Sequence, residues 1–256
     1  MRRATVRPIP DEHAVVAFGE RLRQLPDAGV VLAEAATWRA SSYSPLDAIL
    51  QGDASTASLD ATAHRLDIAA RVGAPGALVC TGPLGARPIA DADAVAACQE
   101  WLADAAPLAV ERGLRIMVEP IHPLMRRWSY VHTLRHALDL TDGITGVGVL
   151  LDVGHVWWEQ GLETIIGEHV DEIVSVQVTN VDRAALDELR YERTALDAGD
   201  VPVAALVATI EAAGYGGWYE QEIRARIPRD ERLAALRASS EWFAALEPGG
   251  EGHLGG

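Results

Sequence analysis

One stretch, residues 148–158, decides the fold; it reads Gly-Val-Leu-Leu-Asp-Val-Gly-His-Val-Trp-Trp. Its first part is apolar and too short for an ordinary buried helix, which is typical of a parallel strand covered on both faces. The run ends in Asp152, and His155 follows three residues later. Burying a charged aspartate at the end of an apolar strand costs free energy unless a cation or hydrogen bonds compensate its charge. We therefore expect a polar site at the C-terminal end of this strand.

Three other strand-like runs end in side chains that carry oxygen: Glu119, Gln177 and Glu222. Because the carboxyl ends of parallel strands meet at one edge, we expect these side chains to converge on Asp152. The three carboxylates are hard oxygen donors, which suit Mg²⁺ or Mn²⁺ better than zinc. For any one carboxylate alone, an ordinary ion pair with an arginine is the alternative.

Strands and helices alternate along the chain. Strands are predicted at residues 30–35, 77–80, 114–119, 148–152, 173–178 and 218–223, and helices at 59–70, 91–112, 129–140, 162–169, 203–213 and 230–246. This alternation indicates a parallel α/β protein, and the spacing favours a closed (β/α)8 TIM barrel over an open sheet. The 45 residues from Gln177 to Glu222 suit about two βα units. We expect one domain over residues 1–247 and a disordered glycine-rich tail at 248–256.

Composition excludes several classes of function. The net charge of −15 disfavours nucleic acid as a partner, and no apolar segment is long enough to span a membrane. We therefore expect a cytoplasmic protein that acts on a small molecule. The chain contains no lysine, which excludes Schiff-base chemistry and a P-loop. The two cysteines are expected to be reduced and structural.

Five pieces of the sequence together resemble the sugar phosphate isomerase/epimerase group of xylose isomerase-like TIM barrels. They are residues 118–123, 151–158, 176–180, 199–201 and 214–222. The similarity extends over roughly residues 57 to 225. It implies a xylose isomerase-like (β/α)8 barrel that holds one divalent metal ion at its mouth and moves a proton next to a sugar carbonyl.

Carried onto matching positions, the resemblance implies four metal ligands: Glu119, Asp152, Gln177 and Glu222. Many relatives have a histidine where this chain has Gln177. The metal, Mn²⁺ or Mg²⁺, would stabilise an enediolate while Glu119 and Glu222 act as acid and base. The resemblance further implies that His155 and Arg183 contact the substrate.

Other residues near these strand ends are weaker candidates for binding substrate. They are His122, Trp157 and Asn180, for which capping or packing is the alternative role. For Arg183 the alternative is an ordinary solvated arginine in a loop. Glu220 is expected to point away from the mouth and to be paired on the outside. Asp200 is expected to cap the helix that follows it.

Three other functions stay open. The first is a dehydratase of a keto-inositol or dehydroshikimate-like compound on the same scaffold. The second is a nuclease related to endonuclease IV, which the negative charge and the scarcity of metal-binding histidines disfavour. The third is a non-catalytic barrel subunit. Only about thirty residues precede the strand at 30–35, so the N-terminal part of the barrel is expected to be short, irregular or completed by a partner chain; a homo-oligomer is also open.

Overall fold

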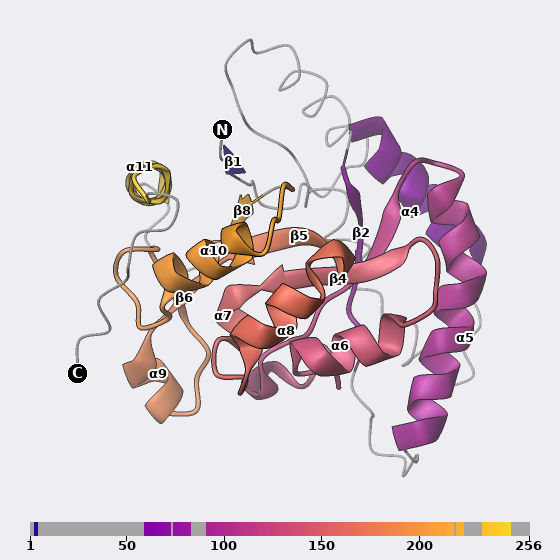
Figure 1. Ribbon diagram of the computed structural model, residues 1–256, viewed down its shortest axis with the longest axis horizontal. Coiled ribbons are helices and arrows are strands. Elements are labelled where there is room, and N and C mark those ends of the chain that lie inside the picture. Colours follow the sequence, from indigo (N-terminus) through magenta and orange to yellow (C-terminus); the bar gives the residue numbers. More distant parts are fainter. Residues whose placement is uncertain are drawn as a thin grey trace.

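A six-stranded parallel sheet forms the centre of the computed structural model (Figure 1). The structure describes residues 3–4, 59–72, 74–82, 91–217, 219–222 and 232–246. The strands are β1 (Arg3–Ala4), β2 (Gly76–Val79), β3 (Arg115–Val118), β4 (Val147–Asp152), β5 (Ile173–Val178) and β8 (Tyr219–Gln221). They lie in the order β1-β8-β5-β4-β3-β2, so the first strand pairs with the last, as closure of a barrel requires. The strand predicted at 30–35 and the tail at 248–256 lie outside the described residues.

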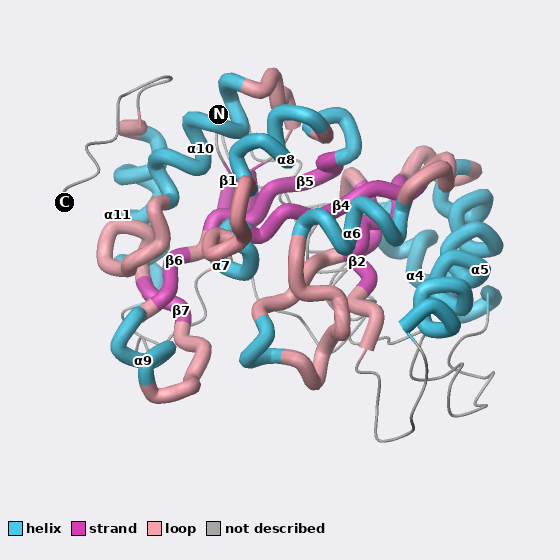
Figure 2. Tube along the Cα trace, turned by 60° about the horizontal axis from the view of Figure 1, so that its bottom comes forward, coloured by secondary structure: helices cyan, strands magenta, loops and turns pink. Residues whose placement is uncertain are grey.

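Helices cover the outer face of the sheet. They are α4 (Leu59–Val72), α5 (Asp91–Val110), α6 (Leu134–Thr141), α8 (Leu162–Glu168), α10 (Val203–Ala212) and α11 (Arg232–Ala244). From α4 to α10 each of these helices contacts the next, so they form an arc around the strands (Figures 1 and 2). Among the described helices, none combines the length and the apolar character needed to cross a membrane.

The two faces of the sheet bury different side chains. Val118, Val149 and Val176 face outward into the main core beneath the helices. Leu78, Met117 and Leu150 form a separate small cluster on the inner face. This division follows from the alternation of side chains along a strand, which sends neighbouring residues to opposite faces.

The segment between β5 and β8 differs from the prediction of two βα units. Strand β5 pairs directly with β8, with Val178 opposite Gln221. The intervening chain forms a small antiparallel pair, β6 (Asn180–Val181) with β7 (Arg193–Thr194), which encloses helix α9 (Arg183–Asp187) and precedes α10. The prediction was wrong because residue spacing measures chain length but not whether a segment adds a strand to the sheet.

Asp200 also differs from the prediction. Its carboxylate accepts the backbone N–H of Arg183 over 2.9 Å, at the start of α9. Helix α10 begins after Pro202, and no side chain caps it. Asp200 therefore ties α9 to the loop before α10 and does not cap the helix that follows it.

Candidate active site

The two-residue period of the strands brings the acidic side chains together. Glu119 lies two residues beyond Met117, and Asp152 lies two beyond Leu150, so both acids continue the inner face. Gln177 is the register partner of Asp152 on the neighbouring strand. Three of the four predicted strand-end side chains therefore point to the inside of the sheet at its C-terminal edge.

Asp152 ends β4 and begins the short helix α7 (Val153–Val156). Its side chain is fully buried, and Oδ1 accepts the N–H of Gly154 over 2.8 Å as a helix cap. One turn of α7 places Nε2 of His155 3.5 Å from Oδ2 of Asp152. Burial raises the pKa of Asp152, and the charge of Arg193 and the Gly154 hydrogen bond oppose that rise.

Glu119 follows β3 and is buried beside the same histidine. Its Oε1 lies 3.6 Å from Nε2 of His155, and the Cys80 thiol donates to its Oε2 over 3.8 Å. Glu119, Asp152 and His155 each offer one ligand atom, and these atoms all lie within 4.8 Å of one another. Two carboxylate oxygens and an imidazole nitrogen are a donor set for a divalent cation, so these three residues could hold a metal ion.

Glu222 comes directly after β8. Its backbone N–H donates to the carbonyl of Val178 over 3.2 Å, which continues the pairing of β8 with β5. Strands β4 and β5 lie between β3 and β8 in the sheet. Glu119 and Glu222 therefore approach the site from opposite sides of Asp152.

A buried arginine, Arg193 of β7, lies among these groups. Its Nη1 and Nη2 each lie 2.7 Å from one oxygen of Glu222, a two-point ion pair. Nη2 also lies 3.3 Å from Oδ2 of Asp152 and 3.3 Å from Nε2 of His155. Burial alone would lower the pKa of Arg193, but the carboxylates around it raise that pKa, led by Glu222. The site thus contains a permanent positive charge.

Glu220 was predicted to lie outside the mouth, and that prediction was wrong. It is 3 % exposed, and its Oε2 accepts a hydrogen bond from Nε2 of Gln177 over 3.3 Å. Glu220 and Glu222 are two residues apart, so they share the inner face, and Glu220 is the register partner of Gln177. Glu220 is therefore a fourth buried acid of the site.

An aromatic and imidazole cluster lies beside the carboxylates. The ring of Tyr191 lies 5.0 Å from the rings of both His122 and His155, and Arg193 lies 5.6 Å from its centroid. Trp158 meets His122 edge to face at 6.2 Å. Burial, with a smaller effect from His132, lowers the pKa of His122 to about 4. Burial and then the charge of Asp152 raise the pKa of Tyr191 well above its usual value.

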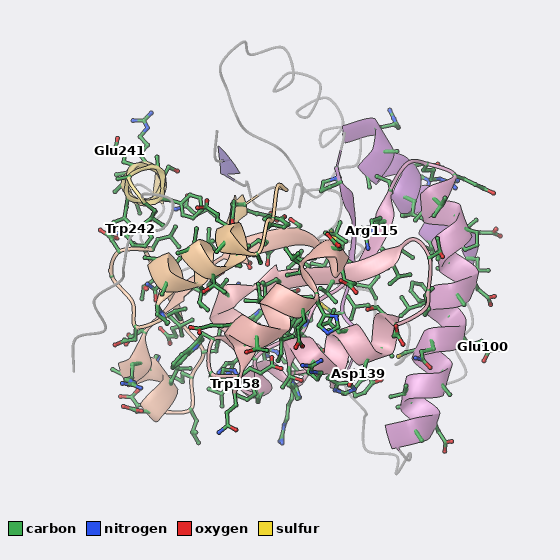
Figure 3. The ribbon with its side chains drawn as sticks, in the orientation of Figure 1. Glu100, Arg115, Asp139, Trp158, Glu241 and Trp242 are labelled. Carbon is green, nitrogen blue, oxygen red and sulfur yellow. The ribbon has the colours of Figure 1, made fainter. Side chains whose placement is uncertain are left out.

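Trp158 marks the outer edge of this cluster. It is 39 % exposed, and its indole N–H donates to the carbonyl of His155 over 2.8 Å. In Figure 3 Trp158 lies low in the view, away from Arg115 at the start of β3. Trp157, which we expected to contact substrate, is half-buried and packs against the main core. Of the two tryptophans, Trp158 is the one beside His122.

Asn180 and Arg183, also predicted to contact substrate, lie outside the aromatic and imidazole cluster. Asn180 is buried, and its Oδ1 accepts the N–H groups of Val181 and Val201 over 2.9 and 2.8 Å. Its Nδ2 donates to the carbonyl of Leu196 over 2.7 Å. The carboxamide of Asn180 thus connects three backbone segments. Arg183 is exposed at the first position of α9.

Sequence reasoning missed Arg193, Tyr191 and the inward position of Glu220. Arg193 and Tyr191 lie in a segment with neither helical nor alternating hydrophobic periodicity, so no local pattern marks them. The pairing of Val181 with Arg193 brings the arginine to the strand ends. The Glu220 position could have been found by applying the two-residue period from Glu222.

A family of proteins with this architecture matches most of the chain. Residues 16–246 match the model of a family described as xylose isomerase-like TIM barrel. A comparison with curated proteins gave no match.

Several solved structures are similar to this chain. A protein from Sinorhizobium meliloti is 28 % identical over 77 % of this chain and 74 % of its own, with a TM-score of 0.67. A 3-keto-D-glucoside 4-epimerase from E. coli is 16 % identical over 95 % of this chain and 99 % of its own, with a TM-score of 0.70. The IolI protein, whose structure carries a zinc atom, is 12 % identical over 96 % of this chain and 98 % of its own, with a TM-score of 0.68. At these identities the last two similarities concern the fold.

Proposed function

Because this chain belongs to the xylose isomerase-like TIM-barrel family, we propose that it is a divalent-metal-dependent isomerase or epimerase of a small sugar, sugar phosphate or polyol-like keto compound. One observation carries the proposal: Glu119 and Glu222 are buried on opposite sides of Asp152 at the C-terminal edge of the sheet. An epimerisation needs two such groups, one to remove a carbon-bound proton and one to return it from the other face. The similar 3-keto-D-glucoside 4-epimerase and an L-ribulose 3-epimerase support this class of reaction.

The proposed ligands of the cation are Glu119, Asp152, Gln177 and Glu222, with His155 close enough to take part. A bound Mn²⁺ or Mg²⁺ would polarise the substrate carbonyl and so acidify the neighbouring C–H group. The oxygen-rich donor set supports these metals, and the zinc atom of IolI makes zinc the metal to compare with them.

The protein groups then move the proton. The Glu119 carboxylate takes the proton from the carbon beside the carbonyl, and the electron pair of that C–H bond forms the enediolate of the substrate. In an epimerase, protonated Glu222 returns a proton to the same carbon from the opposite face. In an isomerase, the proton goes to the neighbouring carbon, and the hydroxyl proton of the first carbon passes to the former carbonyl oxygen, so that the first carbon becomes the new carbonyl. His122, Tyr191 and Trp158 would form the wall against which the substrate lies, because their rings cluster beside the carboxylates.

Hydrogen exchange tests this function directly. The protein, loaded with Mn²⁺, is incubated with a panel of ketoses and their phosphates in deuterated water, and deuterium on the carbon beside the carbonyl is followed by NMR. We expect exchange by the wild type and a loss of about 10²-fold or more in Glu119→Gln and in Glu222→Gln. The exposed Glu163 of α8, changed to Gln, is the matched control.

Two results would change the assignment. Undiminished exchange in Glu222→Gln removes that residue from the mechanism. Loss of water from a substrate with a hydroxyl beta to the carbonyl, without return of the proton, assigns the protein as a dehydratase. We further propose a cytoplasmic location and no nucleic-acid partner, in keeping with the net charge of −15.

A further inference from the structure

The position of Arg193 bears on how a cation enters this site. One nitrogen of its guanidinium, Nη2, lies 3.3 Å from Oδ2 of Asp152, 2.7 Å from Oε2 of Glu222 and 3.3 Å from Nε2 of His155. The second nitrogen, Nη1, lies 2.7 Å from the other oxygen of Glu222. A single positive group therefore already contacts three side chains that a divalent cation would use.

The space available to a cation overlaps the space next to this guanidinium. Mn²⁺ or Mg²⁺ binds oxygen and nitrogen at about 2.1 Å. Because Oδ2 of Asp152 and Nε2 of His155 are 3.5 Å apart, a cation bound to both would lie within about 4 Å of Nη2 on either side. Two positive charges that close, in a buried site with weak screening, repel each other. They would also compete for the same carboxylate oxygens.

Glu222 is the side chain for which the guanidinium and a metal ion would compete most directly. Both of its oxygens are occupied by the two terminal nitrogens of Arg193. Each oxygen keeps a second lone pair, but a metal ion bound there would lie close to the guanidinium, and the two positive charges would repel each other unless a contact to Arg193 is given up. In the absence of a metal, however, the arginine is needed, because Asp152, Glu119 and Glu222 are all buried and a buried carboxylate is costly without a counter-charge.

We propose that Arg193 is an internal counter-ion of this site: its guanidinium and a divalent cation are alternative partners of Asp152 and Glu222, and the arginine must withdraw when the metal binds. Arg193 stabilises the metal-free protein and weakens its affinity for metal. The centroid of the Tyr191 ring lies 5.6 Å from the guanidinium carbon, so a cation–π contact with this ring can stabilise the guanidinium after it withdraws from the carboxylates. The inference rests on the metal site of the proposed function but not on the identity of the reaction.

Metal affinity gives the first test. Mn²⁺ is titrated calorimetrically into metal-stripped wild type, Arg193→Met and Arg190→Met. Methionine keeps much of the side-chain length without the charge. Arg190 is a matched control because its side chain is 39 % exposed and pairs with Glu188 and Glu192. We expect Arg193→Met to bind Mn²⁺ at least tenfold more tightly than wild type, and Arg190→Met to match wild type. Equal or weaker binding by Arg193→Met overturns the proposal.

A second measurement needs no folded variant. Wild-type protein labelled with ¹⁵N-arginine is titrated with diamagnetic Mg²⁺ or Zn²⁺, and the side-chain resonances are followed by NMR. We expect one protected arginine resonance, broadened or shifted from the exposed ones, to move with metal saturation. If every arginine resonance stays in place at saturation, Arg193 does not withdraw and the proposal is wrong.

The outcomes also separate this inference from the proposed function. Metal binding that is equal in wild type and Arg193→Met removes the competition but leaves the metal site intact. Failure of both proteins to bind any of the three metals removes the competition and the metal dependence together. Tighter binding by Arg193→Met supports the inference whatever substrate the protein acts on.

Discussion

The amide of Gln177 donates its Nε2 hydrogen to Oε2 of Glu220 over 3.3 Å, and both side chains are buried on the inner face of neighbouring strands. This contact determines the orientation of the amide. With its nitrogen held by Glu220, Gln177 would offer its oxygen to the proposed metal ion, and oxygen is the donor that Mg²⁺ and Mn²⁺ prefer. Glu220 therefore acts on the proposed metal site through Gln177.

The role of Glu220 can be tested with Glu220→Gln. The variant keeps the size of the side chain but replaces a charged acceptor with an amide that can bond in either orientation, so Gln177 is no longer oriented. We expect Mn²⁺ affinity to fall about tenfold, as is typical when a group that orients a ligand is changed. Calorimetric titration measures it, with the exposed Glu163→Gln as the control. Unchanged affinity would mean that Gln177 is not a ligand or is oriented by other contacts.

Asp152 is expected to be essential for metal binding but replaceable as a helix cap. Asparagine at this position can still accept the N–H of Gly154, so Asp152→Asn removes the charge and preserves the cap. After incubation with Mn²⁺ and desalting, we expect about one metal ion per wild-type chain and almost none in the variant. Elemental analysis gives the ratio.

Asp182 supplies the matched control for that experiment. It caps α9 in the same way, through hydrogen bonds from Ala184 and Ala185, but its side chain is half-buried outside the carboxylate cluster. Asp182→Asn is expected to keep its metal. Equal metal content in Asp152→Asn and Asp182→Asn would contradict the proposed ligand set.

Asn180 is expected to act on stability and not on substrate binding. Asn180→Ala would leave the buried N–H groups of Val181 and Val201 and the carbonyl of Leu196 without their partner. Each unsatisfied buried group costs about 1–3 kcal/mol, so we expect a loss of about 3 kcal/mol in the free energy of unfolding. Urea unfolding measures this loss. A variant of normal stability that binds substrate poorly would instead support a hydroxyl-binding role.

The partial burial of His122 makes the stability of the folded protein depend on pH. Its pKa in the folded protein is about 4, below the ordinary 6.5, because burial disfavours the charged ring. Between these values the unfolded chain binds more protons than the folded one, so stability rises with pH there. The stability that the fold gains from keeping this ring neutral is fully present above pH 6.5 and is lost as the pH falls toward 4.

The replacement His122→Asn isolates this effect. Nδ1 of His122 accepts the N–H of Leu124 over 3.2 Å, a capping role that asparagine can also fill. We expect the variant to lose less stability than wild type between pH 6.5 and 4, and NMR titration of the wild-type ring to give a pKa near 4. A ring that titrates at its ordinary pKa, with parallel pH profiles for the two proteins, would show that His122 is exposed to solvent.

The sequence by itself predicted the five central strands β2, β3, β4, β5 and β8 and the polar residues at their C-terminal ends. Asp152, Glu119 and Gln177 were predictable because an apolar run needs only local periodicity to be recognised, and the strand ends of a parallel sheet must meet. The relation of Asp152 to His155 was also local, since one turn of helix joins them. In each case the deciding contacts lie within a few residues or follow from a single period.

Only the tertiary structure decided what surrounds these residues. Arg193 reaches Asp152, 41 residues earlier in the chain, because a two-residue antiparallel pair folds β7 back onto β6. The direct pairing of β5 with β8 places Gln177 beside Glu220. Both depend on contacts between distant segments, which no local pattern records. Burial then gives those contacts their strength, because charges removed from water interact strongly with whichever groups the fold brings within reach.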